Sequence, residues 1–271
     1  MWTSDLSGAD GILYVDPVSR STSVLFRVRF ILAPNNARED LGVFSIKRKL
    51  RKILRHSEMQ ISLKDIASRE DELEFIDIGA NRGDFIDLAL SLPVTSFITG
   101  FEPIPTLNSA LQKKYQRKPN VTIRSEAISS KDEVRSFNIN ISRPELSSFE
   151  KLTPSGQESY KASNIEMLQV ESITLDSFLK NRPMIPFFLK VDAQGHDYEI
   201  LNSLSWGAVS RIKYILCEVP INPIYENSCS WFDYFSLIYS LGFEPLAFQR
   251  VAVNKVGHLI ETDVLLRNTK V

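Results

Sequence analysis

The stretch that decides the fold is Phe75-Ile-Asp-Ile-Gly-Ala-Asn-Arg-Gly-Asp-Phe85, in which a short apolar run leads into a turn with two glycines. The residues after this turn have an apolar face at helical spacing, formed by Phe85, Leu88, Ala89 and Leu92. The pattern predicts a strand, a tight turn and a helix. Gly79 and Gly83 carry no Cβ, so the backbone can turn sharply and a ligand can approach the main chain. In an open α/β sheet such turns lie at the carboxyl ends of the strands, where ligands bind.

The same alternation of strand and helix patterns continues toward the C-terminus. Further buried strands are expected at residues 96–101, 121–124, 185–191 and 212–219, and helices with apolar faces lie between them. This order predicts an open, mostly parallel sheet with helices on both faces. The last two expected strands, 243–248 and 259–266, are too close for a helical crossover and should form an antiparallel hairpin at the sheet edge. The polar segment 142–164 is predicted to be a long loop or lid.

The first seventy residues differ in character from the rest. Two strands are expected at residues 11–16 and 24–32, followed by a helix at 41–55. One face of this helix is basic, with Lys47, Arg48, Lys49, Arg51, Lys52 and Arg55. The division predicts an N-terminal extension of residues 1–70 ahead of a larger domain, residues 71–271. The basic face is either an ordinary solvated surface or, through residues 47–55, a peripheral contact with an anionic surface.

Composition limits the class of protein. The chain has 271 residues, 43% of them hydrophobic, which excludes disorder and a fibrous protein. Its 32 Lys and Arg residues balance 33 Asp and Glu residues, so nucleic acid is not expected as the main partner. Cys217 and Cys229 cannot build a disulfide framework, and no apolar run reaches the roughly 18 residues of a membrane span. A cytoplasmic location is therefore expected, and the oligomeric state is not set.

The turn after residue 78 has the spacing G-x-x-x-G and differs from the dinucleotide fingerprint G-x-G-x-x-G. Asn81 stands where the fingerprint has the glycine that admits a pyrophosphate, which argues against NAD. A second signal is Gly100-Phe-Glu-Pro103 at the end of the next strand. An acidic residue at the place of Glu102 can accept both hydroxyls of a ribose.

Together these residues resemble the FkbM family of S-adenosylmethionine-dependent methyltransferases. The resemblance covers about residues 74–266 and rests on Phe75–Phe85, Gly100–Pro103, Glu126-Ala-Ile-Ser129, Ser147-Ser148, Ile173-Thr-Leu-Asp176, Leu189-Lys-Val-Asp-Ala-Gln-Gly195 and Thr262-Asp-Val-Leu265. It implies a Rossmann-like (class I) methyltransferase fold with a seven-stranded, mostly parallel sheet. It also implies S-adenosyl-L-methionine as cofactor and O-methylation of a hydroxyl on a sugar or another secondary metabolite, so that the partner is a small-molecule or saccharide acceptor.

The resemblance further implies which residues bind the cofactor. Around its methionine part it places Asp77, Gly79 and Asn81, with Gly83 closing the turn. The ribose hydroxyls are assigned to Glu102. The adenine edge is assigned to Glu126 and Ala127.

The candidate catalytic residues follow the fourth and fifth strands of the domain. Asp192 ends the fourth strand, within Asp192-Ala-Gln-Gly-His-Asp197, and the resemblance implies that methyl group and acceptor meet beside it. The family usually has glutamate where this chain has Gln194, which puts a metal or acid–base role for that position in doubt. An unperturbed imidazole titrates near neutral pH, so the side chain of His196 could take the acceptor's proton, or it is a half-exposed residue in the first turn of a helix. Glu218 is a second candidate for substrate contact.

Two other classes of function remain open at this point. One is an NAD-dependent oxidoreductase or epimerase, against which the missing middle glycine counts. The other is a non-catalytic module that keeps the cofactor fold and binds a partner through the basic helix. A metal site is not expected, because the two cysteines have no pair of histidines near them in sequence.

Overall fold

The computed structural model describes residues 11–18, 25–32, 63–94, 97–253 and 257–271. The chain divides into two compact units, residues 1–53 and 54–271. In the first unit, β1 (Gly11–Val18) pairs antiparallel with β2 (Leu25–Leu32). The basic segment 47–55 lies outside the described residues, so its anionic contact stays a prediction.

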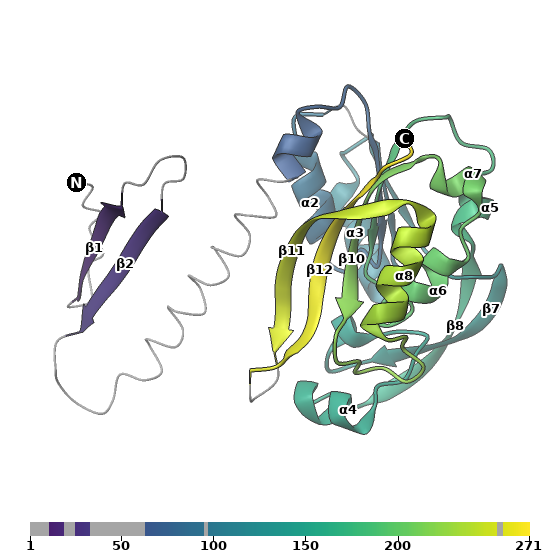
Figure 1. Ribbon diagram of the computed structural model, residues 1–271. Coiled ribbons are helices and arrows are strands. Elements are labelled where there is room, and N and C mark those ends of the chain that lie inside the picture. Colours follow the sequence, from purple (N-terminus) through teal and green to yellow (C-terminus); the bar gives the residue numbers. More distant parts are fainter. Residues whose placement is uncertain (1–10, 19–24, 33–62, 95–96, 254–256) are drawn as a thin grey trace. The chain divides into compact units, whose positions relative to one another are not determined.

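The larger unit is built on one seven-stranded sheet. Its strands are β3 (Glu74–Ile78), β4 (Ile98–Phe101), β5 (Val121–Arg124), β9 (Phe187–Val191), β10 (Ile212–Pro220), β11 (Phe243–Val253) and β12 (Leu259–Asn268). They lie in the order β11-β12-β10-β9-β3-β4-β5. The five strands from β10 to β5 are parallel, whereas β12 runs antiparallel to both β10 and β11. The mostly parallel sheet with a C-terminal antiparallel hairpin is thus confirmed, and Figure 1 shows the hairpin of β11 and β12 beside β10.

Helices cover both faces of this sheet because its strands carry apolar side chains on both sides. Along β3, Phe75 packs in one core and Ile76 in the other. The Ile76 side is covered by α5 (Leu175–Leu179), α6 (Asp197–Asn202), α7 (Trp206–Val209) and α8 (Trp231–Leu241). The Phe75 side is covered by helical residues 63–67, α2 (Asp84–Leu90) and α3 (Pro105–Tyr115). Leu63 is buried in this second core, ahead of the boundary that the sequence suggested near residue 70. In the part of the chain that is described, no helix is long and apolar enough to cross a bilayer.

A second, three-stranded sheet was not foreseen from the sequence. It consists of β6 (Ala127–Ile128), β8 (Ile165–Ile173) and β7 (Glu133–Asn140), in that order, with β7 antiparallel to β8. Both long strands expose many of their side chains, among them the apolar Val134, Ile165 and Met167, and bury few, so neither gives an apolar run. Phe137 and Val170 are their buried apolar residues.

The segment 142–164, which was expected to be a loop or lid, is partly helical and packed down. It contains a 3₁₀ turn, Pro144–Leu146, and helix α4 (Pro154–Tyr160), whose N-cap Thr153 accepts a hydrogen bond from the Gly156 backbone. Leu146 and Leu152 are buried against Ile224, Tyr225 and Ile260. This small core fixes the segment on the carboxyl side of the main sheet, so the segment is not a long loop, and its role as a lid stays a prediction.

Candidate functional site

A cavity of about 330 Å³ lies where β3, β4, β9 and β10 end. The register aligns the ends of the first three strands, because Ile78 of β3 is opposite Phe101 of β4 and Val191 of β9. Six of the residues proposed from the sequence line this cavity, namely Gly79, Asn81, Glu102, Ala127, Asp192 and Glu218. The volume is in the usual range for a site that holds a small molecule or cofactor.

Glu102 is held rigidly on the wall of this cavity. Its side chain is buried, and its Oε2 accepts the backbone N–H of Asn81 at 2.8 Å while its Oε1 accepts that of Ile104 at 2.9 Å. Asn81 has a positive φ of 48°, which turns its N–H toward this carboxylate. Burial raises the pKa of Glu102 to about 7. Two acceptor positions of the carboxylate remain open for a ligand.

Asp77 is not part of the cavity wall. Its fully buried carboxylate forms an ion pair with Lys190, whose Nζ is 3.1 Å from Asp77 Oδ1 and 3.3 Å from Asp192 Oδ2. The same ammonium group donates to the carbonyl oxygen of Gly79 at 3.2 Å. Burial by itself would lower the pKa of Lys190. The carboxylates of Asp77 and Asp192 together have the larger effect and raise this pKa above its usual value, so the ammonium stays charged. Lys190 thus ties the ends of β3 and β9 together.

The glycines of the turn are required by the protein's own packing. Gly79 has φ 78°, and a Cβ there would lie 2.1 Å from the backbone oxygen of Asp192. Gly83 has φ 81°, and a Cβ there would lie 2.3 Å from the hydroxyl oxygen of Tyr115. Only Gly79 lines the cavity. The sequence analysis explained these glycines by the approach of a ligand to the main chain. That explanation is incomplete, because the backbone at Asp192 already occupies the space that a Cβ of residue 79 would need.

One end of the cavity is crossed by a chain of polar contacts that begins at Asp192. Gln194 donates its Nε2–H to Asp192 Oδ1 at 2.6 Å and accepts the hydroxyl proton of Tyr225 at 2.8 Å. The Tyr225 hydroxyl also lies 3.2 Å from the carbonyl oxygen of Leu146. Gln194 is therefore a positioning group that connects Asp192 to the segment over the cavity.

The same end of the cavity gathers acidic side chains that the sequence analysis did not bring together. Glu218 of β10 stands opposite Asp263 of β12 in the register, and Glu261 lies beside them. The Tyr160 hydroxyl of α4 donates to Glu261 Oε1 at 3.2 Å. Burial raises the pKa of Asp263 to about 7 and raises that of Glu218 well above its usual value. Alternate residues of a hairpin share a face, and that is the signal by which Glu261 and Asp263 could have been found.

His196 is buried outside this cavity, with 2% of its surface exposed. Its Nε2 is 3.0 Å from Ser129 Oγ, and its Nδ1 is 3.2 Å from Glu150 Oε1. Its ring packs edge-on against Phe149. The idea of a half-exposed histidine is wrong, and the role of proton acceptor stays a prediction that this burial disfavours.

Glu126 is also separated from the cavity wall, because its carboxylate forms an ion pair with Arg124. Ala127, the neighbour assigned with it, does line the cavity. The segment 142–164 adds wall residues that the sequence did not single out, among them Arg143 and Glu145. In the described residues no group of histidine, cysteine and carboxylate side chains is arranged to hold a metal ion.

Comparison with solved structures gives weak overall similarity. A methyltransferase FkbM from Methylobacillus flagellatus KT is 13% identical, with a TM-score of 0.47 over 72% of this chain. The chain spans 44% of the length of that structure. A precorrin-6y C5,15-methyltransferase from Geobacter metallireducens is 13% identical, with a TM-score of 0.41 over 78% of this chain and 87% of the other. No curated protein matches the chain.

The family comparison is more specific. Residues 77–245 match the model of the methyltransferase FkbM domain, and they contain the Gly79 turn, Glu102, Asp192 and Glu218. The strand order, with β12 inserted between β10 and β11, agrees with the Rossmann-like class I methyltransferase fold that the sequence predicted. Because the match spans more than half of the sequence, the chain belongs to the FkbM family of methyltransferases.

Proposed function

We propose that this protein is an S-adenosyl-L-methionine-dependent O-methyltransferase whose acceptor is a hydroxyl of a sugar or another secondary metabolite. The observation that carries the proposal is Glu102, which two backbone N–H groups hold on the wall of a 330 Å³ cavity at the ends of parallel strands. A carboxylate fixed in this way is suited to accept the paired hydroxyls of a ribose. The family to which the chain belongs supplies the reaction type.

The cavity residues fit the parts of this cofactor. The ribose would be bound by Glu102, and the adenine would lie against the apolar wall of Phe101, Ala127 and Ile128. The amino-acid part would lie toward the Gly79 turn and Asp192, which the ion pair with Lys190 holds in place. An acidic end of the cavity also suits a ligand that carries a sulfonium cation.

When bound, the cofactor supplies a methyl group that its sulfonium already activates for displacement. The protein therefore has to align the acceptor, exclude water and accept one proton. Segment 142–164 covers the cavity and contributes Arg143, Ser147 and Tyr160, whose polar groups suit a hydroxylated acceptor. Asp192 and Glu218 stand at the acidic end, where the acceptor hydroxyl would be oriented.

Isothermal titration tests the cofactor. We expect S-adenosylmethionine to bind and NAD to give no heat, since Asn81 replaces the glycine that a pyrophosphate needs. Glu102→Gln should weaken S-adenosylmethionine binding more than tenfold, because loss of a charged hydrogen-bond partner costs roughly 1.5–3 kcal/mol. The matched control is Glu171→Gln, an exposed strand glutamate. Equal affinity in wild type and Glu102→Gln would show that the ribose does not lie at Glu102.

A further inference from the structure

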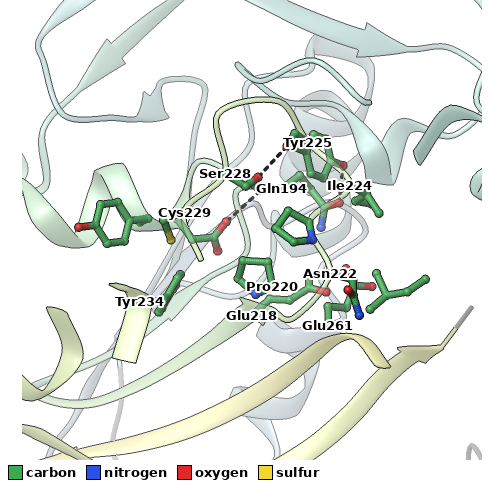
Figure 2. Close-up of a pocket in the computed structure, with 15 residues that line it drawn as sticks. Gln194, Glu218, Pro220, Asn222, Ile224, Tyr225, Ser228, Cys229, Tyr234 and Glu261 are labelled. Carbon is green, nitrogen blue, oxygen red and sulfur yellow. Dashed lines mark hydrogen bonds between the residues drawn. The ribbon is translucent and has the colours of Figure 1, made fainter. Parts of the chain in front are cut away.

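The cavity shares a wall with a second, much smaller one of about 30 Å³. Gln194, Glu218 and Glu261 line both, and Figure 2 shows these three side chains around the smaller one. Oε1 of Glu218 is buried at this wall and has no hydrogen-bond donor among the described residues. A space of that size accommodates about one water molecule beside Glu218.

Glu218 and Glu261 form a pair. Both side chains line the two cavities, and Glu261 lies two residues along β12 from Asp263, the direct partner of Glu218 on β10. Two carboxylates on one buried wall repel each other, and a single proton held between them relieves that repulsion. The arrangement therefore favours a singly protonated pair on the wall of the larger cavity.

The surroundings of the pair favour that proton. Asp192 in the loop after β9, Asp263 on β12 and Tyr160 on α4 line the larger cavity with the pair, and Asp197 at the start of α6 and Tyr225 in the loop after β10 line the smaller one with it. The cations nearby, Lys190 and Arg143, are directed elsewhere, the first to Asp77 and Asp192 and the second to Glu145. A second full negative charge on the pair is therefore unfavourable until a cation enters the cavity.

We propose that the Glu218–Glu261 pair holds one shared proton in the ligand-free protein, releases it when a sulfonium cation enters, and then accepts the hydroxyl proton of the methyl acceptor. The inference rests on the proposed function. In the transfer, a lone pair of the acceptor oxygen forms the new C–O bond and the electrons of the broken C–S bond remain on sulfur. The hydroxyl proton passes to the carboxylate pair, which ends the cycle as it began, with one proton.

The experiment compares two ligands that differ in the charge on sulfur. S-adenosylmethionine and S-adenosylhomocysteine are titrated into the full chain at pH 7, in buffers of low and high ionisation enthalpy, which gives the protons released on binding. Both ligands carry the same ribose for Glu102, so proton release at Glu102 is the same for both. The difference in protons released between the two ligands therefore reports the effect of the sulfonium charge. We expect S-adenosylmethionine to release more protons than S-adenosylhomocysteine, by an amount approaching about one proton.

Variants locate the source of that difference. Glu218→Gln and Glu261→Gln should each remove most of it, with S-adenosylhomocysteine affinity changed by less than about threefold. Glu171→Gln, on the exposed side of β8, should leave it unchanged. If wild type releases equal numbers of protons with both ligands, or if Glu218→Gln keeps the difference, the pair does not hold the proton.

The wild-type protein gives an answer even where a variant does not fold. A proton on the pair competes with the sulfonium, so the ratio of S-adenosylmethionine to S-adenosylhomocysteine affinity should rise from about pH 6 to pH 9. A ratio that does not change with pH overturns the inference. Failure of S-adenosylmethionine to bind at all overturns the proposed function itself, and a bound cofactor without differential proton release overturns only the role of the pair.

Discussion

Replacing His196 by alanine distinguishes a catalytic base from a residue that only stabilises the fold. In the structure His196 joins three segments, because it is the N-cap residue of α6 and its imidazole contacts Ser129 after β6 and Glu150 ahead of α4. Its removal takes one hydrogen-bond partner from the buried Ser129 and one from the half-buried Glu150, and removes an aromatic contact with Phe149. A buried hydrogen bond contributes about 1 kcal/mol, one to a charged group about 2 kcal/mol and the aromatic contact about 1 kcal/mol. We expect a loss of about 4 kcal/mol in the free energy of unfolding.

The assay is urea unfolding followed by circular dichroism, with methyl transfer measured per folded molecule. Ser129→Ala removes one partner and should cost only about 1 kcal/mol. The hydrogen bond with His196 lowers the pKa of Glu150, so this contribution is present above the ordinary glutamate pKa and is lost as the pH falls through the lowered value. The destabilisation by His196→Ala should accordingly shrink in acid.

One result would refute the purely structural role of His196. If His196→Ala keeps the wild-type free energy of unfolding but loses methyl transfer by about 10²-fold or more at unchanged cofactor affinity, the histidine is the base. If His196→Ala instead transfers methyl at the wild-type rate per folded molecule across about pH 6 to 9, His196 is not the base.

Three further predictions concern other features. Gly79→Ala should lower the free energy of unfolding, measured in urea, by more than about 3 kcal/mol, because the new Cβ would meet a backbone oxygen. The control is Gly257→Ala, where φ is also positive but the space around a Cβ is open, and it should cost only about 1 kcal/mol. Burial raises the pKa values of Glu102 and Asp263 to about 7, so the native state binds their protons more tightly than the unfolded chain. Unfolding free energy should then fall as pH rises from about 4 to about 7 and level off above, and a Glu102→Gln/Asp263→Asn double variant should flatten this profile. Glutamine replacements in the basic segment 47–55 should leave cofactor affinity unchanged but weaken any binding to anionic vesicles, binding that salt should also weaken.

The main sheet could be predicted because its strands are buried on both faces and appear as short apolar runs between helical patterns. The second sheet could not, because β7 and β8 place polar residues such as Glu133 and Glu171 toward solvent and bury few apolar ones. The sheet is extended by β6, which pairs with β8, and Phe137 packs against Phe149, and neither contact is visible in the sequence.

At the site, sequence reasoning identified residues that follow a strand directly. Gly79, Glu102 and Asp192 all line the cavity, because the ends of parallel strands meet at one edge. His196 shows the limit of this approach. Its partners lie 46 and 67 positions away in the chain, and only the fold reveals that both of its nitrogens are occupied.

The position of β12 has a consequence for how the protein is made. Along the chain β12 is the last of the described strands, yet it lies inside the sheet, between β10 and β11. During synthesis on the ribosome β11 emerges first, but it has no partner in the sheet until residues up to Asn268 have followed. Until then β10 presents an open edge, and the cavity lacks Glu261 and Asp263. A nascent chain therefore completes its fold and its site together, in the same late step.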